Sequence, residues 1–588
     1  MTDTKQSRLT ATLLCVTPPD EHQEQGIRAF LQKKYGEDVA LTIQQDASLK
    51  SGFQLHVGSE VYDWSAKGRM EQFRQQVEQL VAKNTRKDII PLLRSSIDEF
   101  RLLAKSSEVG TVKSIGDGIA VVEGLEHAAY GEILMFDNGI KGMVQDLRRN
   151  ETGCILFDNA DDISAGSKVA RTGKTAGVPV GDAFLGRVVD ALGRPIDGGD
   201  AIPADGYRPV EEPAPGIIDR QSVDTPMETG LLSIDAMFPI GRGQRELIIG
   251  DRQTGKTAIA LDAMLNQKGK NVICVYVAIG QKASSVAQLV ENLRKRDAMD
   301  YCVVVSATAG EADTMQYIAP YAGCAMAEYF MHKGRDVLIV YDDLSKHAIA
   351  YRAMSLLLER APGREAYPGD VFYLHSRLLE CSAHLSDKLG GGSMTALPIV
   401  ETQAGDVSAY IPTNIISITD GQIFLESDLF FAGQRPAVNV GLSVSRVGGA
   451  AQTKATKKAT GSLRLDLAQY REMEVFTQFS SDLDDSTKEQ LHYGQGLMRI
   501  LRQKQYHPLS MHQQVIVLVC AMGHVLSKVA VKDVTDFRDA LLDHFEQEHS
   551  DLCRSLEDEK VLTDDMKQEI LRIAEAFRTA NAERFRKE

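Results

Sequence analysis

Near the middle of the chain the sequence reads Gly250-Asp251-Arg252-Gln253-Thr254-Gly255-Lys256-Thr257, which fits the phosphate-loop pattern G-x-x-x-x-G-K-[ST]. The apolar run 246–249 predicts a strand before it, and the run 258–265 predicts a helix after it. Such a loop points several backbone N–H groups at one anion. Lys256 would reach the β- and γ-phosphates, and the Thr257 hydroxyl would bind Mg²⁺. We therefore expect a site for Mg²⁺ with ATP or ADP; the alternative is a glycine-rich turn that matches by chance.

A second motif lies about 85 residues further on, where an apolar run over 336–343 ends in two carboxylates. An Asp at the carboxyl end of a strand can order the Mg²⁺ shell beside a phosphate-loop threonine. Of the two, Asp342 is the preferred candidate over Asp343. The alternative is a strand that ends in an ordinary acidic turn.

Composition excludes several classes of protein. The 588 residues suffice for three or four domains. A net charge of −15 argues against nucleic acid as a partner. No apolar run reaches the ~18–20 residues of a membrane span. The longest run, 515–522, predicts a buried helix, and the run 11–16 is too short for a signal peptide. We expect a cytosolic chain that meets the membrane only through partners.

The 8 cysteines are scattered and include no C-x-x-C pair. Several stand in apolar runs such as 272–275. The pattern predicts buried, reduced thiols with neither disulfide nor metal roles.

Changes of pattern along the chain predict a multi-domain fold. We expect a small α/β unit at 1–82, a linker with an N-terminal helix at 83–106, a β-barrel at 107–175, a P-loop α/β nucleotide-binding domain with a mostly parallel sheet at 176–452, and a helical C-terminal domain at 453–588. In the first part we expect helices over 21–35, 69–81 and 89–103 and strands over 39–44 and 52–57. In the barrel we expect strands over 109–112, 119–122, 131–135 and 153–156.

From about residue 85 to the end, the sequence resembles the alpha subunit of the F-type rotary ATP synthase. The resemblance rests on the phosphate loop and on the segments 276–282, 341–346, 362–370 and 436–446, in the same order. It implies a subunit of an alternating hexamer with catalytic beta subunits, around a central-stalk gamma subunit and held by peripheral-stalk b and delta-type subunits. It also implies a peripheral location at the cytoplasmic face of the bacterial plasma membrane, where ATP synthesis or hydrolysis is coupled to proton or sodium transport.

Position 281 bears on whether the chain hydrolyses the nucleotide it binds. The strand predicted over 272–278 is followed by Gly280-Gln281-Lys282, at the position where the family's catalytic subunits carry Gly-Glu-Arg. Gln281 can hold a water molecule but cannot accept a proton near neutral pH. Losing a general base costs ~10²–10⁴ in rate. We expect bound ATP to persist, although a glutamine also orients water in some GTPases.

The resemblance assigns chemistry to Arg446, which it places at a subunit boundary. There it would act as an arginine finger on the neighbour's transferring phosphoryl group, an effect of ~10³–10⁵ in rate. The alternative is an ordinary surface ion pair. Ser443 would support the same interface.

For the base, the resemblance indicates Gln503 and Gln505, whose amides suit adenine's mixed edge, with Arg435 and Pro436 flanking the ring. The alternative is a polar helix end. The acidic segment 479–485 is either the loop that faces the rotating stalk or a solvated turn.

The first ~80 residues precede the region that resembles alpha subunits. Residues 46–73 resemble the C-terminal domain of the delta subunit of the same enzyme, and Asp63 and Ser65 suit a helix N-cap. Such a module would tie the peripheral stalk to the head at high local concentration. The alternative is an unrelated appendage.

Two other readings of the whole chain stay open. A homohexameric secretion motor or RNA translocase would need a carboxylate at position 281. A connector with a dead nucleotide site is opposed by the intact Lys256, Thr257 and Asp342.

Overall fold

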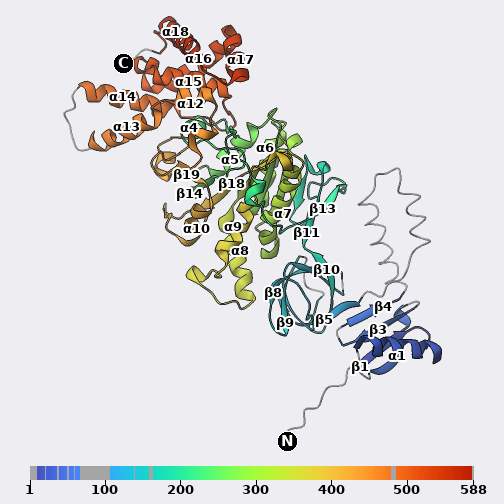
Figure 1. Ribbon diagram of the computed structural model, residues 1–588. Helices are drawn as coiled ribbons and strands as arrows, with labels where there is room; N and C mark the ends of the chain where they lie inside the picture. Colours follow the sequence, from blue (N-terminus) through green and yellow to red (C-terminus); the bar gives the residue numbers. More distant parts are fainter. Residues whose placement is uncertain are drawn as a thin grey trace, which may run out of the picture. The chain divides into compact units, whose positions relative to one another are not determined.

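The computed structural model describes residues 10–19, 21–35, 39–49, 52–58, 60–65, 106–137, 139–157, 163–477 and 485–585. The chain divides into two compact units, Met1–Ala176 and Gly177–Glu588 (Figure 1). None of the described helices is long and apolar enough to cross a lipid bilayer.

The first unit begins with a small α/β part. Its elements are β1 (Thr10–Cys15), α1 (Glu21–Tyr35), β2 (Ala40–Gln45), β3 (Phe53–Val57) and β4 (Glu60–Asp63). The strand order is β2-β1-β3-β4, with β1 and β2 parallel and the other pairs antiparallel. Leu13, Leu31, Leu55 and Tyr62 form the core under α1.

The predictions for this part are largely confirmed. The helix over 21–35 is α1, and the two predicted strands match β2 and β3 to within one residue. β1 and β4 were not predicted as strands. Asp63 Oδ1 accepts a hydrogen bond from the Ser65 backbone N–H (2.8 Å). The helices predicted over 69–81 and 89–103 lie outside the described residues.

Six strands then close into a barrel. They are β5 (Ser106–Gly116), β6 (Ile119–Glu123), β7 (Glu132–Phe136), β8 (Lys141–Leu147), β9 (Glu151–Leu156) and β10 (Lys168–Thr175). The antiparallel order is β10-β7-β8-β9-β6-β5, and β10 pairs with β5 to complete the ring. β5 also pairs with β4, so one ladder joins the two parts of this unit.

The barrel confirms the predicted fold, but β8 and β10 were missed. Their sequences, KGMVQDL and KVARTGKT, carry charged or polar residues at many positions, since a barrel strand needs only one buried face. Val144 and Val169 supply the buried side chains there.

The second unit is built on a mostly parallel sheet with the order β12-β16-β15-β17-β18-β14-β19-β20; only β19 and β20 run antiparallel. These strands are β12 (Val188–Asp190), β14 (Leu247–Gly250), β15 (Val272–Gln281), β16 (Cys302–Thr308), β17 (Asp336–Asp342), β18 (Ser393–Glu401), β19 (Gly421–Leu425) and β20 (Val444–Ser445). A separate ribbon pairs β11 (Gly177–Val180) with β13 (Gly206–Pro209). The central strands are fully buried, which explains their continuous apolar runs.

Helices cover both faces of this sheet (Figure 1). They are α4 (Leu232–Met237), α5 (Lys256–Leu265), α6 (Ala283–Arg294), α7 (Asp313–His332), α8 (Leu344–Leu357), α9 (Val371–Glu380), α10 (Tyr410–Ile418) and α11 (Ser427–Phe431). Alternate residues of β15 and β17 pack with α5 and α6 in one core cluster, which includes Tyr276 and Val340. Val277, the next residue of β15 after Tyr276, points to the opposite face of the sheet and lies against Gly323 of α7.

The chain ends in a helical region that shares this core. Its helices are α12 (Lys454–Thr460), α13 (Leu463–Thr477), α14 (Asp485–Ile500), α15 (Met511–Met522), α16 (Val534–Glu548), α17 (Ser550–Glu559) and α18 (Asp564–Ala580). Residues 515–521 of the predicted run are buried within α15, and Met522 is partly buried. The loop over 479–485 falls outside the described residues, apart from the backbone of Asp485. The fold class is confirmed, while the domain boundaries stay predictions.

Candidate nucleotide site

The phosphate loop connects β14 to α5, as predicted. Gly255 stands directly before α5 at φ 96°, a left-handed conformation that glycine adopts without a Cβ penalty. The Lys256 side chain is buried, and its Nζ donates to the backbone O of Gly250 (2.9 Å) and Asp251 (2.5 Å). Burial lowers the pKa of Lys256, so its cation lacks water and gains from any anion that enters the loop.

The remaining loop residues hold the loop in shape. Asp251 Oδ1 accepts from Thr402 Oγ1 (2.7 Å) and the Gly405 N–H (2.8 Å), while its Oδ2 accepts from Ser427 Oγ (3.1 Å). Thr254 Oγ1 donates to the Asp251 carbonyl (2.8 Å). Gln253 has φ 63°, and the exposed Arg252 lies 3.8 Å from a Glu401 oxygen. The sequence assigned these residues to nucleotide binding without showing that Asp251 ties the loop to two other segments.

The carboxylate of Asp342 is the centre of the polar network beside this loop. Its Oδ2 accepts from Thr257 Oγ1 (2.7 Å) and from the Tyr276 hydroxyl, and its Oδ1 accepts from Gln281 Nε2 (3.1 Å). Asp343 is used differently, because its Oδ1 caps α8 through the Lys346 N–H (2.8 Å). The geometry therefore favours Asp342 over Asp343 as the partner of Thr257.

Thr257 and Asp342 fit a Mg²⁺ site chemically. Mg²⁺ prefers hard oxygen ligands and keeps several waters. A hydroxyl and a carboxylate stand side by side at the end of the phosphate loop, and neither offers nitrogen or sulfur. One oxygen would contact the cation directly and the other through water. Tyr276, whose hydroxyl donates to this carboxylate, was missed, because a Tyr in a buried apolar strand carries no signal for such a role.

Two cavities flank the loop. The larger, about 530 Å³, is lined by Thr254 and Gly255 of the loop together with Arg435, Pro436, Gln503 and Gln505. The smaller, about 390 Å³, is lined by Thr257, Asp342, Gln281 and Tyr276. Gln505 lines both. The structure thus brings the predicted base residues and phosphate residues around one space.

Within the larger cavity the two predicted glutamines differ. The Gln503 amide is taken up by the backbone: Oε1 accepts from the Leu232 N–H (3.1 Å), and Nε2 donates to the carbonyls of Gly230 (2.7 Å) and His507 (2.9 Å). Arg435 stacks over the Phe430 ring, with its guanidinium carbon 4.4 Å from the ring centre. Gln503 therefore shapes the cavity wall, which leaves Gln505 as the better candidate for the base edge.

Asp262 of α5 also lines this cavity and was missed. It accepts from the Tyr506 N–H (2.8 Å), which holds Tyr506 at φ 68°, an uncommon conformation for a residue other than glycine. Burial raises the pKa of Asp262 to about 6. An aspartate in the run IALDAML gave no cue beyond its polarity.

Arg446 lies away from both cavities. It directly follows β20, where its N–H donates to the Asp420 carbonyl (2.8 Å). Its exposed guanidinium makes no hydrogen bond or ion pair with any residue that the structure describes. Burial raises the pKa of the nearby Glu246 well above its usual range, so that acid favours its neutral form and leaves the arginine charge uncompensated. Ser443 is buried, and its Oγ accepts from the Phe424 N–H (3.0 Å).

Four family models match separate parts of the chain, and all four describe subunits of ATP synthase. Residues 230–445 match the family described as "ATP synthase alpha/beta family, nucleotide-binding domain". Residues 105–173 match its beta-barrel domain, and residues 452–577 match its C-terminal domain. Residues 1–77 match the "ATP synthase delta (OSCP) subunit".

Curated relatives agree with the three alpha/beta matches. The chain is 58% identical over 483 residues to "ATP synthase subunit alpha" of Clostridium botulinum strain Hall, an alignment that covers 82% of this chain and 96% of the relative. It is 56% identical over 491 residues to the protein of the same name from Clostridium kluyveri strain NBRC 12016, with 84% and 97% covered.

Proposed function

The chain belongs to the ATP synthase alpha/beta family, and from that membership we propose that it binds Mg-ATP without turning it over and lends Arg446 to a neighbouring catalytic subunit. In this function the chain is the alpha-type member of an alternating hexamer that surrounds a gamma-type central stalk. ATP synthesis or hydrolysis there is coupled to proton or sodium transport.

One observation carries the proposal: the position where a catalytic carboxylate would stand holds Gln281, and its amide already donates to Asp342 (3.1 Å). An amide cannot take a proton from water, so Gln281 cannot serve as the general base at this position. The intact Lys256, Thr257 and Asp342 still support tight Mg-ATP binding. A site that binds but does not hydrolyse suits a structural or regulatory nucleotide.

The exposed guanidinium of Arg446 supports the second half of the proposal. A desolvated arginine stabilises the charge that spreads over a transferring phosphoryl group. The Arg446 guanidinium has no partner among the described residues, and Arg446 does not line either cavity of this chain. Its charge is therefore available to a second subunit.

The test compares the purified chain alone with the chain reconstituted with its catalytic sister subunit. We expect no steady-state ATPase activity from the chain alone, stoichiometric retention of ATP, and activity on mixing. Fast turnover by the chain alone would instead favour a self-sufficient homohexameric motor.

For the N-terminal module, we propose that it anchors the peripheral stalk, with b-type and delta-type subunits as partners. The match of residues 1–77 to the delta family supports this function. The whole assembly would be peripheral at the cytoplasmic face of a bacterial plasma membrane. Deleting residues 1–77 should leave ATP binding intact and release the reconstituted head from stalk-containing vesicles; unchanged retention would contradict the anchoring function.

A further inference from the structure

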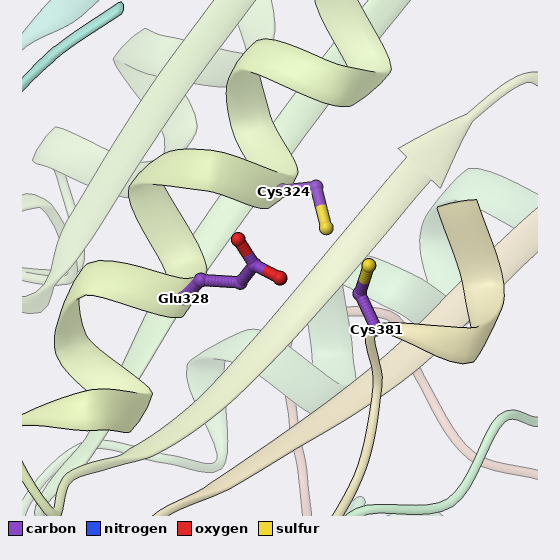
Figure 2. A group of neighbouring side chains, drawn as sticks. All are labelled: Cys324, Glu328 and Cys381. Carbon is purple, nitrogen blue, oxygen red and sulfur yellow. The ribbon is translucent and has the colours of Figure 1, made fainter. Parts of the chain in front are cut away.

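A cluster of three buried side chains lies on the face of the sheet opposite α5, away from the nucleotide site. Cys324 and Glu328 stand one turn apart on α7, and Cys381 directly follows α9. Their ligand atoms all lie within 4.8 Å of one another, and the side chains converge on a common point (Figure 2). All three residues are at most 6% exposed.

The groups are arranged as a connected set. The Cys324 thiol contacts the Cys381 thiol, which in turn contacts the Glu328 carboxylate. The Arg208 Nε donates to Glu328 Oε2 (3.1 Å). The hydroxyl of Tyr341 is completely buried beside Cys324 and makes no well-formed hydrogen bond with the described residues.

We propose that Cys324, Cys381 and Glu328 bind a divalent cation of the Zn²⁺ class, with the Tyr341 hydroxyl at the fourth position. Two sulfurs and a carboxylate oxygen are ligands that Zn²⁺ accepts, and four ligands complete a tetrahedron. Arg208 holds Glu328 through Oε2 and leaves Oε1 for the metal, the usual arrangement in which a second group orients a ligand.

The net charge of the proposed ligands favours a divalent over a monovalent cation. The three proposed ligands, two thiolates and one carboxylate, carry three negative charges when deprotonated, and buried charge is costly unless it is paired. Arg208 offsets this only in part, because its guanidinium also pairs with the partly exposed Glu212. A divalent cation therefore neutralises more of the buried charge than a monovalent ion would. Binding releases the two thiol protons, so affinity should rise with pH.

The chain contains a matched control. Cys274 of β15 and Cys302 of β16 are also buried, and they lie opposite each other in the strand register. They are not among the groups of the described residues that could hold a metal, since no third ligand stands with them. If buried thiols bound metal in general, both pairs of cysteines would bind it. If the three ligands form a specific site, only the pair Cys324 and Cys381 would bind metal.

The experiment loads the reduced full-length chain with zinc, removes loose metal with a weak chelator and measures metal per chain by elemental analysis. We expect about one zinc ion per chain, with background levels in Cys381→Ala and in Glu328→Gln, and the full content in Cys274→Ala. Cobalt loading should give the near-ultraviolet thiolate charge-transfer band in the parent chain and in Cys274→Ala only. ATP binding by each variant checks that it is folded, and Glu328→Gln preserves volume if Cys381→Ala does not fold.

Three outcomes would overturn the proposal. The first is zinc content in the parent chain no higher than in Cys381→Ala. The second is an equal fall in Cys274→Ala. The third is a mass, measured without reductant on freshly purified protein, that shows a disulfide between Cys324 and Cys381.

Discussion

Asp342 and Arg446 carry opposite charges and have opposite surroundings. The Asp342 carboxylate is buried and accepts hydrogen bonds from Thr257, Tyr276 and Gln281, all within one chain. The Arg446 guanidinium is exposed and pairs with nothing that the structure describes. The Asp342 charge is satisfied within the chain, whereas the Arg446 charge is left to solvent or, in the proposed function, to a partner subunit. A fully paired buried charge indicates internal order, and an exposed unpaired one needs a test in the assembly.

The largest effect is expected from replacing Arg446, the residue whose charge is unpaired. Arg446→Ala should lower the ATPase rate of the reconstituted complex by about 10³–10⁵, because the phosphoryl charge loses its cation. ATP binding by the chain alone should not change. Arg572→Ala removes an arginine that pairs with Glu569 inside the chain, and it should leave the rate unaltered. A similar loss in both variants would mean that Arg446 acts only through stability.

A second change tests whether the self-contained site is silent for lack of a base. Gln281→Glu should raise single-turnover hydrolysis by the chain alone by about 10²–10⁴, the usual contribution of a general base. Gln281→Leu removes the amide without adding a base and should give no gain. Equal rates in the two variants would show that another missing element silences the site.

A third change tests whether the phosphate loop binds ATP. Lys256→Ala removes charge-assisted hydrogen bonds of about 1.5–3 kcal/mol, which is roughly 10–150-fold in ATP affinity. Lys268→Ala, which removes an exposed lysine shortly after α5, serves as the matched control. Equilibrium dialysis with Mg-ATP measures both; unchanged affinity in Lys256→Ala would contradict nucleotide binding at this loop.

The smallest effect concerns a cation that the fold does pair. His512 hydrogen-bonds to Glu557 (2.8 Å) and Glu546 (2.7 Å) in the helical region. Burial favours its neutral form, but these carboxylates raise its pKa above the ordinary 6.5. The protonated histidine therefore stabilises the fold fully below about pH 6.5, and this stability is lost as pH rises through the raised pKa.

We expect His512→Gln to lower the free energy of unfolding by about 1 kcal/mol or less below pH 6.5, with a smaller difference at higher pH. Thermal unfolding across this range measures it. ATPase activity of the complex should not change, in contrast to Arg446→Ala. A difference that grows with pH would contradict the assigned ion pairs.

The sequence predicted the nucleotide site better than its surroundings. The phosphate loop and the strand that ends at Asp342 are local patterns, because one loop and one strand end hold all the required groups. The Gln503 amide is different, since its partners Gly230 and Leu232 come from a distant segment. No spacing rule reveals that this side chain is already occupied.

The same limit explains the cysteines. Because no short spacing joins Cys324 to Cys381, the sequence predicted isolated thiols, and their burial is confirmed for all 8. Only the packing of α9 against α7 brings the two sulfurs to Glu328. The missed strands β8 and β10 show the limit for secondary structure, where pairing across the barrel outweighs local polarity.

The N-terminal α/β part and the nucleotide-binding sheet belong to one polypeptide, so every copy of the sheet comes with one copy of the N-terminal part. In the proposed alternating hexamer each of three such chains brings its own stalk-binding module, so a single off-axis stalk would occupy one and leave two vacant. The threefold assembly would then carry stalk-binding modules that no stalk occupies. Because module and alpha-type domains are translated as one polypeptide, the number of modules would always equal the number of alpha-type subunits.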